Sequence, residues 1–188
     1  MTQFTLTVAT SADGYIARAT DDAPQNWASA EEQELFFRDV EAADWAIMGR
    51  HTHEAADKPH RRRIIFSTGA GGWRRPTQLW LDPRGLSPGD LVARVTEVAP
   101  LERGLILGGT RVHDWFLAEG AIDRINLTVE PLDFGAGLPV FSDSAGEGPE
   151  DIFAARGFTI LSDRVLNAAG TRYTEWARAT APSKDVAQ

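Results

Sequence analysis

Two short apolar runs that end in glycine constrain the fold of this chain more than any other feature of its sequence. Residues 45–48 lead into Gly49, and residues 105–107 lead into the pair Gly108 and Gly109. A segment that can form a helix follows each run. Strand, glycine turn and helix are the unit from which parallel sheets are built. Both turns would then open at the carboxyl ends of their strands, the edge of such a sheet where ligands bind.

The remaining sequence alternates between strand and helix patterns in the same way. Ser29 followed by Glu32 is a capping-box signature for a helix that ends near Ala42. Strands are predicted at 3–9, 15–17, 44–48, 64–66, 79–81, 105–107 and 122–129, helices at 87–98 and 110–119, loops at 69–72 and 133–150, and a terminal hairpin at 158–166 and 171–176. These elements predict an α/β fold with a mixed, mostly parallel central sheet, flanking helices and an antiparallel C-terminal hairpin.

Length and composition limit the organisation of the chain and its partners. The 188 residues suit one domain, which we place at 1–179, with a loose tail at 180–188. The sequence has neither an apolar run long enough to span a membrane nor a signal-peptide pattern, so we expect a cytoplasmic protein without membrane contact. Its net charge of −8 argues against binding nucleic acid. With no cysteine and no evident third ligand for its histidines, the chain is predicted to hold no metal.

The two glycine turns have the chemistry of phosphate sites, although each also has a purely structural interpretation. Gly49 lets the backbone approach a ligand, and Arg50 adds a planar guanidinium that suits phosphate. Gly108 and Gly109 either leave room for a pyrophosphate at a helix start or form a tight turn. The spacing is not the three-glycine dinucleotide fingerprint, so an ordinary Rossmann domain is not supported.

Taken in order, these motifs resemble those of the dihydrofolate reductase superfamily. The resemblance covers roughly residues 3–178 and rests on the segments 8–17, 27–29, 47–54, 64–67 and 106–117. Residues 13–17, 122–123 and 131–141 are closer to one branch, the reductase half of the bifunctional deaminase–reductase of riboflavin biosynthesis. The deaminase half has no counterpart here, because its zinc site requires a pair of cysteines.

The resemblance implies a three-layer dihydrofolate-reductase-like fold, a homodimer and bound NADPH. It places cofactor contacts at Ala9, Ile16, Gly49, Arg50, His51, Thr52, Ser67, Thr68, Gly108, Gly109, Thr110, Arg111 and Val112. An arginine near hydroxyl groups would match the additional 2′-phosphate that distinguishes NADPH from NADH. Substrate contacts would come from Asp13, Trp27 and Phe36, although the two aromatic residues can equally be core residues.

Glu32 has two interpretations. The resemblance places it where dihydrofolate reductases carry an acidic residue on the first helix, with Thr128 as its hydroxyl partner. There it would orient a ring and support protonation. Alternatively, Glu32 is the third helical residue of the capping box that begins at Ser29. Arg61–Arg63 is predicted to be a solvated approach to a strand, with contact to a substrate phosphate as the alternative. His113 is predicted to be a surface or packing residue.

Three functions follow from these observations. The leading hypothesis is an NADPH-dependent reductase that transfers hydride to a small heterocyclic substrate of the 5-amino-6-(5-phosphoribosylamino)uracil type. The second is a dihydrofolate or pterin reductase, which Glu32 with Thr128 favours. The third is a nucleotide-binding protein without catalysis, which would keep the phosphate motifs but need no proton donor.

Overall fold

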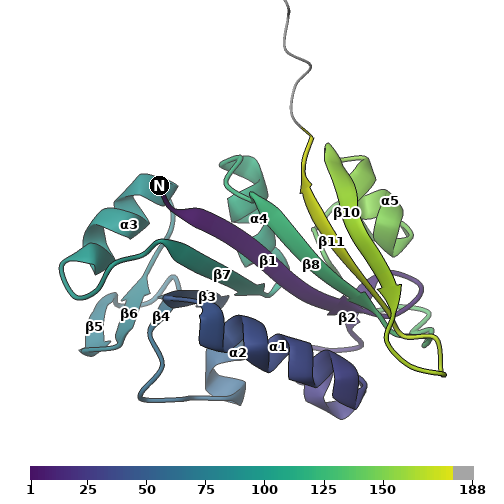
Figure 1. Cartoon of the computed structure of the whole chain (residues 1–188). Coiled ribbons are helices and arrows are strands. Elements are labelled where there is room, and N and C mark those ends of the chain that lie inside the picture. The colour runs from purple at the N-terminus through teal and green to yellow at the C-terminus, as the bar shows by residue number, and fades with distance from the viewer. Residues whose placement is uncertain (180–188) are drawn as a thin grey trace, which may run out of the picture.

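A nine-stranded sheet forms the centre of the computed structural model, which describes residues 1–179 (Figure 1). Its order is β10-β11-β8-β1-β7-β3-β4-β6-β5. These strands are β1 (Gln3–Thr10), β3 (Trp45–Gly49), β4 (Arg63–Phe66), β5 (Gly72–Arg75), β6 (Gln78–Leu81), β7 (Arg103–Gly108), β8 (Arg124–Val129), β10 (Phe158–Val165) and β11 (Arg172–Arg178). A second sheet pairs β2 (Tyr15–Ala17) with β9 (Leu138–Pro139). The helices are α1 (Ala30–Ala42), α2 (Arg50–Ala55), α3 (Pro88–Thr96), α4 (Thr110–Ala118) and α5 (Pro149–Ala154), with a 3-10 turn at Pro24–Asn26.

The sheet is parallel in its centre and antiparallel at both ends. The six strands from β8 to β6 run parallel to one another. The β10–β11 hairpin joins β8 antiparallel, and β5 joins β6 antiparallel. Helices α1 and α2 cover one face, and α3, α4 and α5 lie on the other (Figure 1). The predicted mixed, mostly parallel α/β fold with a terminal hairpin is therefore confirmed.

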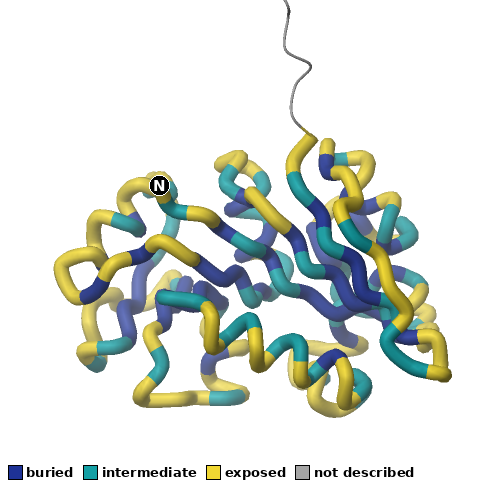
Figure 2. The backbone as a smooth tube through the Cα atoms, viewed as in Figure 1, coloured by how far each residue is buried: buried dark blue, intermediate teal, exposed yellow. Residues whose placement is uncertain are grey.

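The apolar core lies mainly on the face that carries α3, α4 and α5. Leu91, Phe116 and Ile152 from these helices pack in one cluster with buried strand residues such as Leu6 and Ile106. The opposite face has a much smaller cluster, made of Ala46, Met48, Ile65 and Trp80. Figure 2 shows α1 as mostly exposed or half-buried, and within Ala30–Ala42 the one buried residue is an acid, Glu32. Helix α1 therefore covers a hollow instead of sealing a core.

Four short elements differ from the prediction, one of them the 3-10 turn at Pro24–Asn26. Strand β5 begins at the end of the predicted loop 69–72, and β9 and the start of α5 fall inside the predicted loop 133–150. Strand β9 has only two residues, and α5 has one apolar pair, Ile152 and Phe153, on its buried side. Such short elements show no periodicity of their own. The predicted tail at 180–188 lies outside the described residues. Among residues 1–179, no helix has both the length and the apolar character needed to cross a membrane.

Candidate functional site

The two glycine turns lie side by side. Strands β3 and β7 are parallel neighbours, and Met48 lies opposite Gly108. A Cβ atom placed on Gly49 would be 3.9 Å from both the Gly108 carbonyl oxygen and the Gly109 amide nitrogen. Helices α2 and α4 begin immediately after these turns. The prediction that both turns open at one edge of the sheet is therefore confirmed, and the amides of two helix starts converge there.

The paired glycines differ in what their surroundings allow. Gly108 has φ +91°, a conformation that favours glycine, and a Cβ atom there would lie 2.5 Å from His113 Nε2. A Cβ atom on Gly109 would meet no other atom within 4 Å. Gly108 is thus required by the packing of the turn, whereas Gly109 borders open space.

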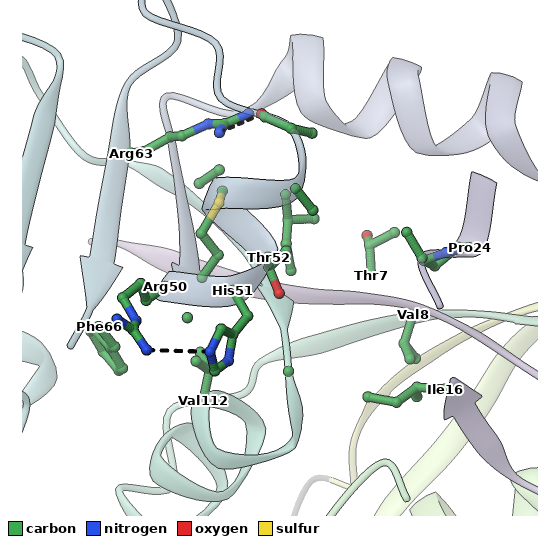
Figure 3. A pocket seen from close by; sticks show the side chains of 18 of the residues that line it. Thr7, Val8, Ile16, Pro24, Arg50, His51, Thr52, Arg63, Phe66 and Val112 are labelled. Atoms are coloured by element: carbon green, nitrogen blue, oxygen red, sulfur yellow. Dashed lines mark hydrogen bonds between the residues drawn. The ribbon is translucent and has the colours of Figure 1, made fainter. Parts of the chain in front are cut away.

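A cavity of about 1430 Å³ lies beside these turns. Figure 3 shows Arg50, His51 and Thr52 at one part of the cavity, near Phe66 and Val112, with other lining side chains farther along β1 and β2. The predicted site residues that line it are Ala9, Ile16, Glu32, Phe36, Gly49, Arg50, His51, Thr52, Ser67, Thr68, Gly109, Thr110, Arg111 and Val112. The structure thus brings most of the predicted cofactor contacts together around one space.

Polar side chains near the glycine turns are only partly engaged. The Arg50 guanidinium is exposed, 3.3 Å from His51 Nε2 and 4.0 Å from a Glu54 carboxylate oxygen. Thr110 Oγ1 donates a hydrogen bond of 2.6 Å to the Pro139 carbonyl, so its hydroxyl holds the β9 segment against α4. Arg50 and Arg111, which is also exposed, are therefore the basic side chains at these turns that can orient toward an anion at little cost.

Four predicted site residues do not line the cavity. The Asp13 carboxylate accepts hydrogen bonds from the backbone amides of Phe134 (3.0 Å) and Gly135 (2.7 Å), so it holds a loop in place. Trp27 packs edge-on against Phe134, with ring centroids 5.2 Å apart. Thr128 is buried in β8, and no hydrogen bond joins it to Glu32 in residues 1–179. The fourth is Gly108, which packs against the ring of His113.

Glu32 lines the cavity with a buried carboxyl group. Its side chain is 5% exposed, and burial together with the charges of Glu130 and Asp39 raises its pKa to about 7. The capping-box interpretation is only half right. Ser29 Oγ accepts a hydrogen bond from the Glu32 amide, but the Ser29 amide donates to Glu130 Oε1 at 2.8 Å and not to Glu32. The surroundings of Glu32 therefore favour its protonated form far more than those of an exposed glutamate would.

His113, interpreted from the sequence as a surface or packing residue, is a buried wall of the site. Its Nδ1 lies 2.8 Å from the Val140 carbonyl oxygen, and burial lowers its pKa to about 4. The ring is therefore neutral, with Nδ1–H donating to Val140 and Nε2 without a partner in residues 1–179. Its position three residues before the buried Phe116 was a helical-spacing signal that it faces inward.

The prediction that Arg61–Arg63 is a solvated approach to a strand is wrong for Arg63. Arg63 is buried and its Nη1 donates to the Ala56 carbonyl at 2.8 Å, beside His53 Nδ1 at 3.1 Å. Arg61 pairs with Glu41 at 3.0 Å, and Arg62 is exposed. Within residues 1–179, no three histidine or acidic side chains are grouped as a metal site.

Comparison with known proteins shows related structures. A putative riboflavin biosynthesis protein from Shewanella sp. PV-4 superposes with a TM-score of 0.68 at 20% identity, over 95% of this chain and 99% of that one. The diaminohydroxyphosphoribosylaminopyrimidine deaminase/5-amino-6-(5-phosphoribosylamino)uracil reductase of Thermotoga maritima gives a TM-score of 0.68 at 17% identity, over 95% of this chain and 57% of that one. This chain thus spans little more than half of the Thermotoga protein.

At these identities the two structures show a shared fold. No curated protein sequence matched the chain. The model of the RibD C-terminal domain family, in contrast, matches residues 2–149. Because that match spans most of the sequence, the chain belongs to the RibD C-terminal domain family.

Proposed function

We propose that this protein is an NADPH-dependent reductase that transfers hydride to a small heterocyclic substrate of the 5-amino-6-(5-phosphoribosylamino)uracil type. One observation carries the proposal: two helix-initiating glycine turns and a protonatable carboxyl, Glu32, line the same cavity. The first feature suits a dinucleotide and the second suits proton transfer. Membership of the RibD C-terminal domain family and the name of the Thermotoga neighbour support the choice of substrate class.

The residues around the cavity fit a dinucleotide phosphate. Gly109 leaves its backbone uncovered toward the space where a pyrophosphate would lie, and Gly49 lines the same space. Arg50, with the hydroxyls of Ser67 and Thr68, would hold the 2′-phosphate. The backbone of Ala9 and the half-buried side chain of Ile16 would contact the nicotinamide. NADPH, when bound, would supply the hydride.

Glu32 would supply the proton that accompanies the hydride. Reduction of a carbon–nitrogen double bond adds hydride to the carbon and a proton to the nitrogen, so the site needs a group that is protonated at neutral pH. Glu32, with a pKa of about 7, meets that requirement. It would become a carboxylate after the transfer and regain a proton from solvent.

The test is the loss of NADPH absorbance in the presence of candidate substrates. We expect oxidation with an aminopyrimidine ribosylamino phosphate and little with dihydrofolate or dihydropterin. Oxidation by the latter two would favour the second candidate, a folate or pterin reductase, for which the acidic group on α1 is the supporting observation. NADPH binding without oxidation of any substrate would favour a nucleotide-binding protein. A homodimer in the cytoplasm, implied by the resemblance and the composition, remains part of this proposal.

A further inference from the structure

Glu130 lies directly after β8 and connects α1 to the C-terminal hairpin. Its side chain is 3% exposed. Oε1 accepts hydrogen bonds from the Ser29 amide at 2.8 Å and from Ser29 Oγ at 2.7 Å, and Oε2 accepts one from Thr171 Oγ1 at 2.7 Å. Three donors thus bind one buried carboxyl group, and two of them come from Ser29, the residue that caps α1.

Helix α3 also begins with a capping serine, but within residues 1–179 no residue from elsewhere in the chain takes part in its cap. Its cap is a complete capping box: Ser87 Oγ accepts from the Asp90 amide at 3.3 Å, and the Asp90 carboxylate accepts from the Ser87 amide at 2.7 Å. In α1, the first of these bonds is present between Glu32 and Ser29, also at 3.3 Å. The second is replaced by Glu130. The carboxyl of Glu32 therefore has no capping partner to hold it at the helix start, and it lines the cavity.

We propose that Glu130 is a positioning residue for Glu32: it takes the capping place that Glu32 would otherwise occupy and leaves the Glu32 carboxyl facing the cavity. This inference rests on the proposed function only in that Glu32 is taken to donate a proton to the substrate. The arrangement itself follows from the hydrogen bonds at Ser29.

Glu130 also acts on Glu32 through its charge. Burial contributes most to the raised pKa of Glu32, followed by Glu130 and then Asp39. Asp39 lies two turns along the same helix and is held by Thr7 Oγ1 at 3.0 Å and Asn126 Nδ2 at 2.7 Å. Glu130 thus acts on the Glu32 carboxyl in two ways: it takes the capping place, and it adds to the effect of burial on the pKa of Glu32.

The first test separates charge from shape. Glu130→Gln keeps an oxygen that can accept from Ser29 but removes the negative charge. We expect the titration midpoint of Glu32, followed by carboxyl-carbon NMR of glutamate-labelled protein and assigned with Glu32→Gln, to fall from about 7 toward the ordinary 4.5. A purely structural role for Glu130 would leave that midpoint where it is, and an unchanged midpoint would overturn the proposal.

The second test asks where the Glu32 carboxyl goes when Glu130 is removed. In Glu130→Ala, Glu32 should return to the Ser29 amide and complete a capping box like that of α3. Glu32→Ala should then lower Tm in the Glu130→Ala background but not in the unaltered protein. Asp90→Ala, which removes the box of α3, should lower Tm equally in both backgrounds and serves as the matched control. Equal effects of Glu32→Ala in both backgrounds would contradict the proposal.

Neither measurement uses substrate. A protein that oxidises no NADPH would refute the reductase function, while the NMR titration and the Tm cycle would still decide the role of Glu130. If Glu130→Ala does not fold, the same Tm cycle is run with Glu130→Leu, whose side chain fills the space but cannot accept from Ser29.

Discussion

Glu32 and Asp90 hold equivalent positions, each three residues after a capping serine, but their carboxyl groups have opposite properties. Asp90 is exposed, and its hydrogen bonds from Ser87 lower its pKa. Glu32 is buried beside a cavity, and its pKa is raised to about 7. The difference comes mainly from the burial of Glu32. Glu130 adds to it through its charge, and it accepts the hydrogen bond of the Ser29 amide in place of Glu32. A group that would stabilise a helix is thereby available for proton transfer.

Glu32→Gln tests that availability at the level of one residue. If Glu32 donates a proton, kcat/KM should fall roughly a hundredfold or more, within the range expected for lost acid–base help. The activity of the unaltered enzyme should decrease as pH rises through about 7, because the acid form is then lost, and this decrease should be absent in the variant. Steady-state kinetics against pH would measure both effects. Glu31→Gln is the control, because Glu31 is the exposed neighbour of Glu32. Full activity of a stable Glu32→Gln protein would show that Glu32 takes no part in the reaction.

Arg50→Ala tests the choice of cofactor. Loss of a charge-assisted hydrogen bond to the 2′-phosphate costs about 1.5–3 kcal/mol, so the preference for NADPH over NADH should narrow roughly ten- to a hundredfold. Arg94→Ala is a matched control, because Arg94 is an exposed arginine on α3, on the other face of the sheet, and does not line the cavity. Titration of both cofactors by fluorescence would give the ratios. Equal affinity of the unaltered protein for NADPH and NADH would exclude a 2′-phosphate site.

At the scale of elements, the turn between β7 and α4 separates a structural glycine from a ligand-facing one. Gly108→Ala should destabilise the fold by about 1–3 kcal/mol, since its φ is +91° and the new methyl group would meet the ring of His113. Gly109→Val should leave the Tm nearly unchanged but abolish NADPH binding, because its side chain would enter the open space. Thermal melts and cofactor titrations distinguish the two. Normal NADPH binding by folded Gly109→Val would mean that the pyrophosphate lies elsewhere.

The same turn shows what can be predicted from sequence. Apolar runs before Gly49 and Gly108 predicted buried parallel strands, and the rules of such sheets brought the two turns to one edge. Neighbouring details depended on distant residues. Glu130 displaces Glu32 from its cap, and Asp13 binds the loop at Gly135, in both cases across about a hundred residues of sequence or more. No local pattern carries such contacts.

At the scale of the whole molecule, the two faces of the sheet have different tasks. The face under α3, α4 and α5 holds most of the core, whereas the face under α1 and α2 carries the small cluster around Met48 and the cavity. Strand periodicity predicts that both faces are covered, but it does not reveal that one covering helix, α1, buries a single acid. Val8, Phe66 and Val112 belong to both the main core cluster and the cavity wall, so substitutions in that wall that spare these three residues can change binding with little cost to folding.

Glu32 should also make the stability of the whole molecule depend on pH. Its pKa is about 7 in the folded protein and near 4.5 when exposed, so the folded state binds the proton more tightly. The stabilisation is complete below pH 4.5 and is lost as pH rises to about 7, by at most roughly 3 kcal/mol. His113 acts in the opposite direction, because its pKa is lowered from 6.5 to about 4 and stability is gained as pH rises between these values.

The difference in unfolding free energy between the unaltered protein and Glu32→Gln cancels the contribution of His113. We expect urea titrations to show that the unfolding free energy of Glu32→Gln rises relative to that of the unaltered protein between pH 4.5 and pH 7. A difference that does not depend on pH would show that the Glu32 carboxyl is not held in a buried site beside other negative charges.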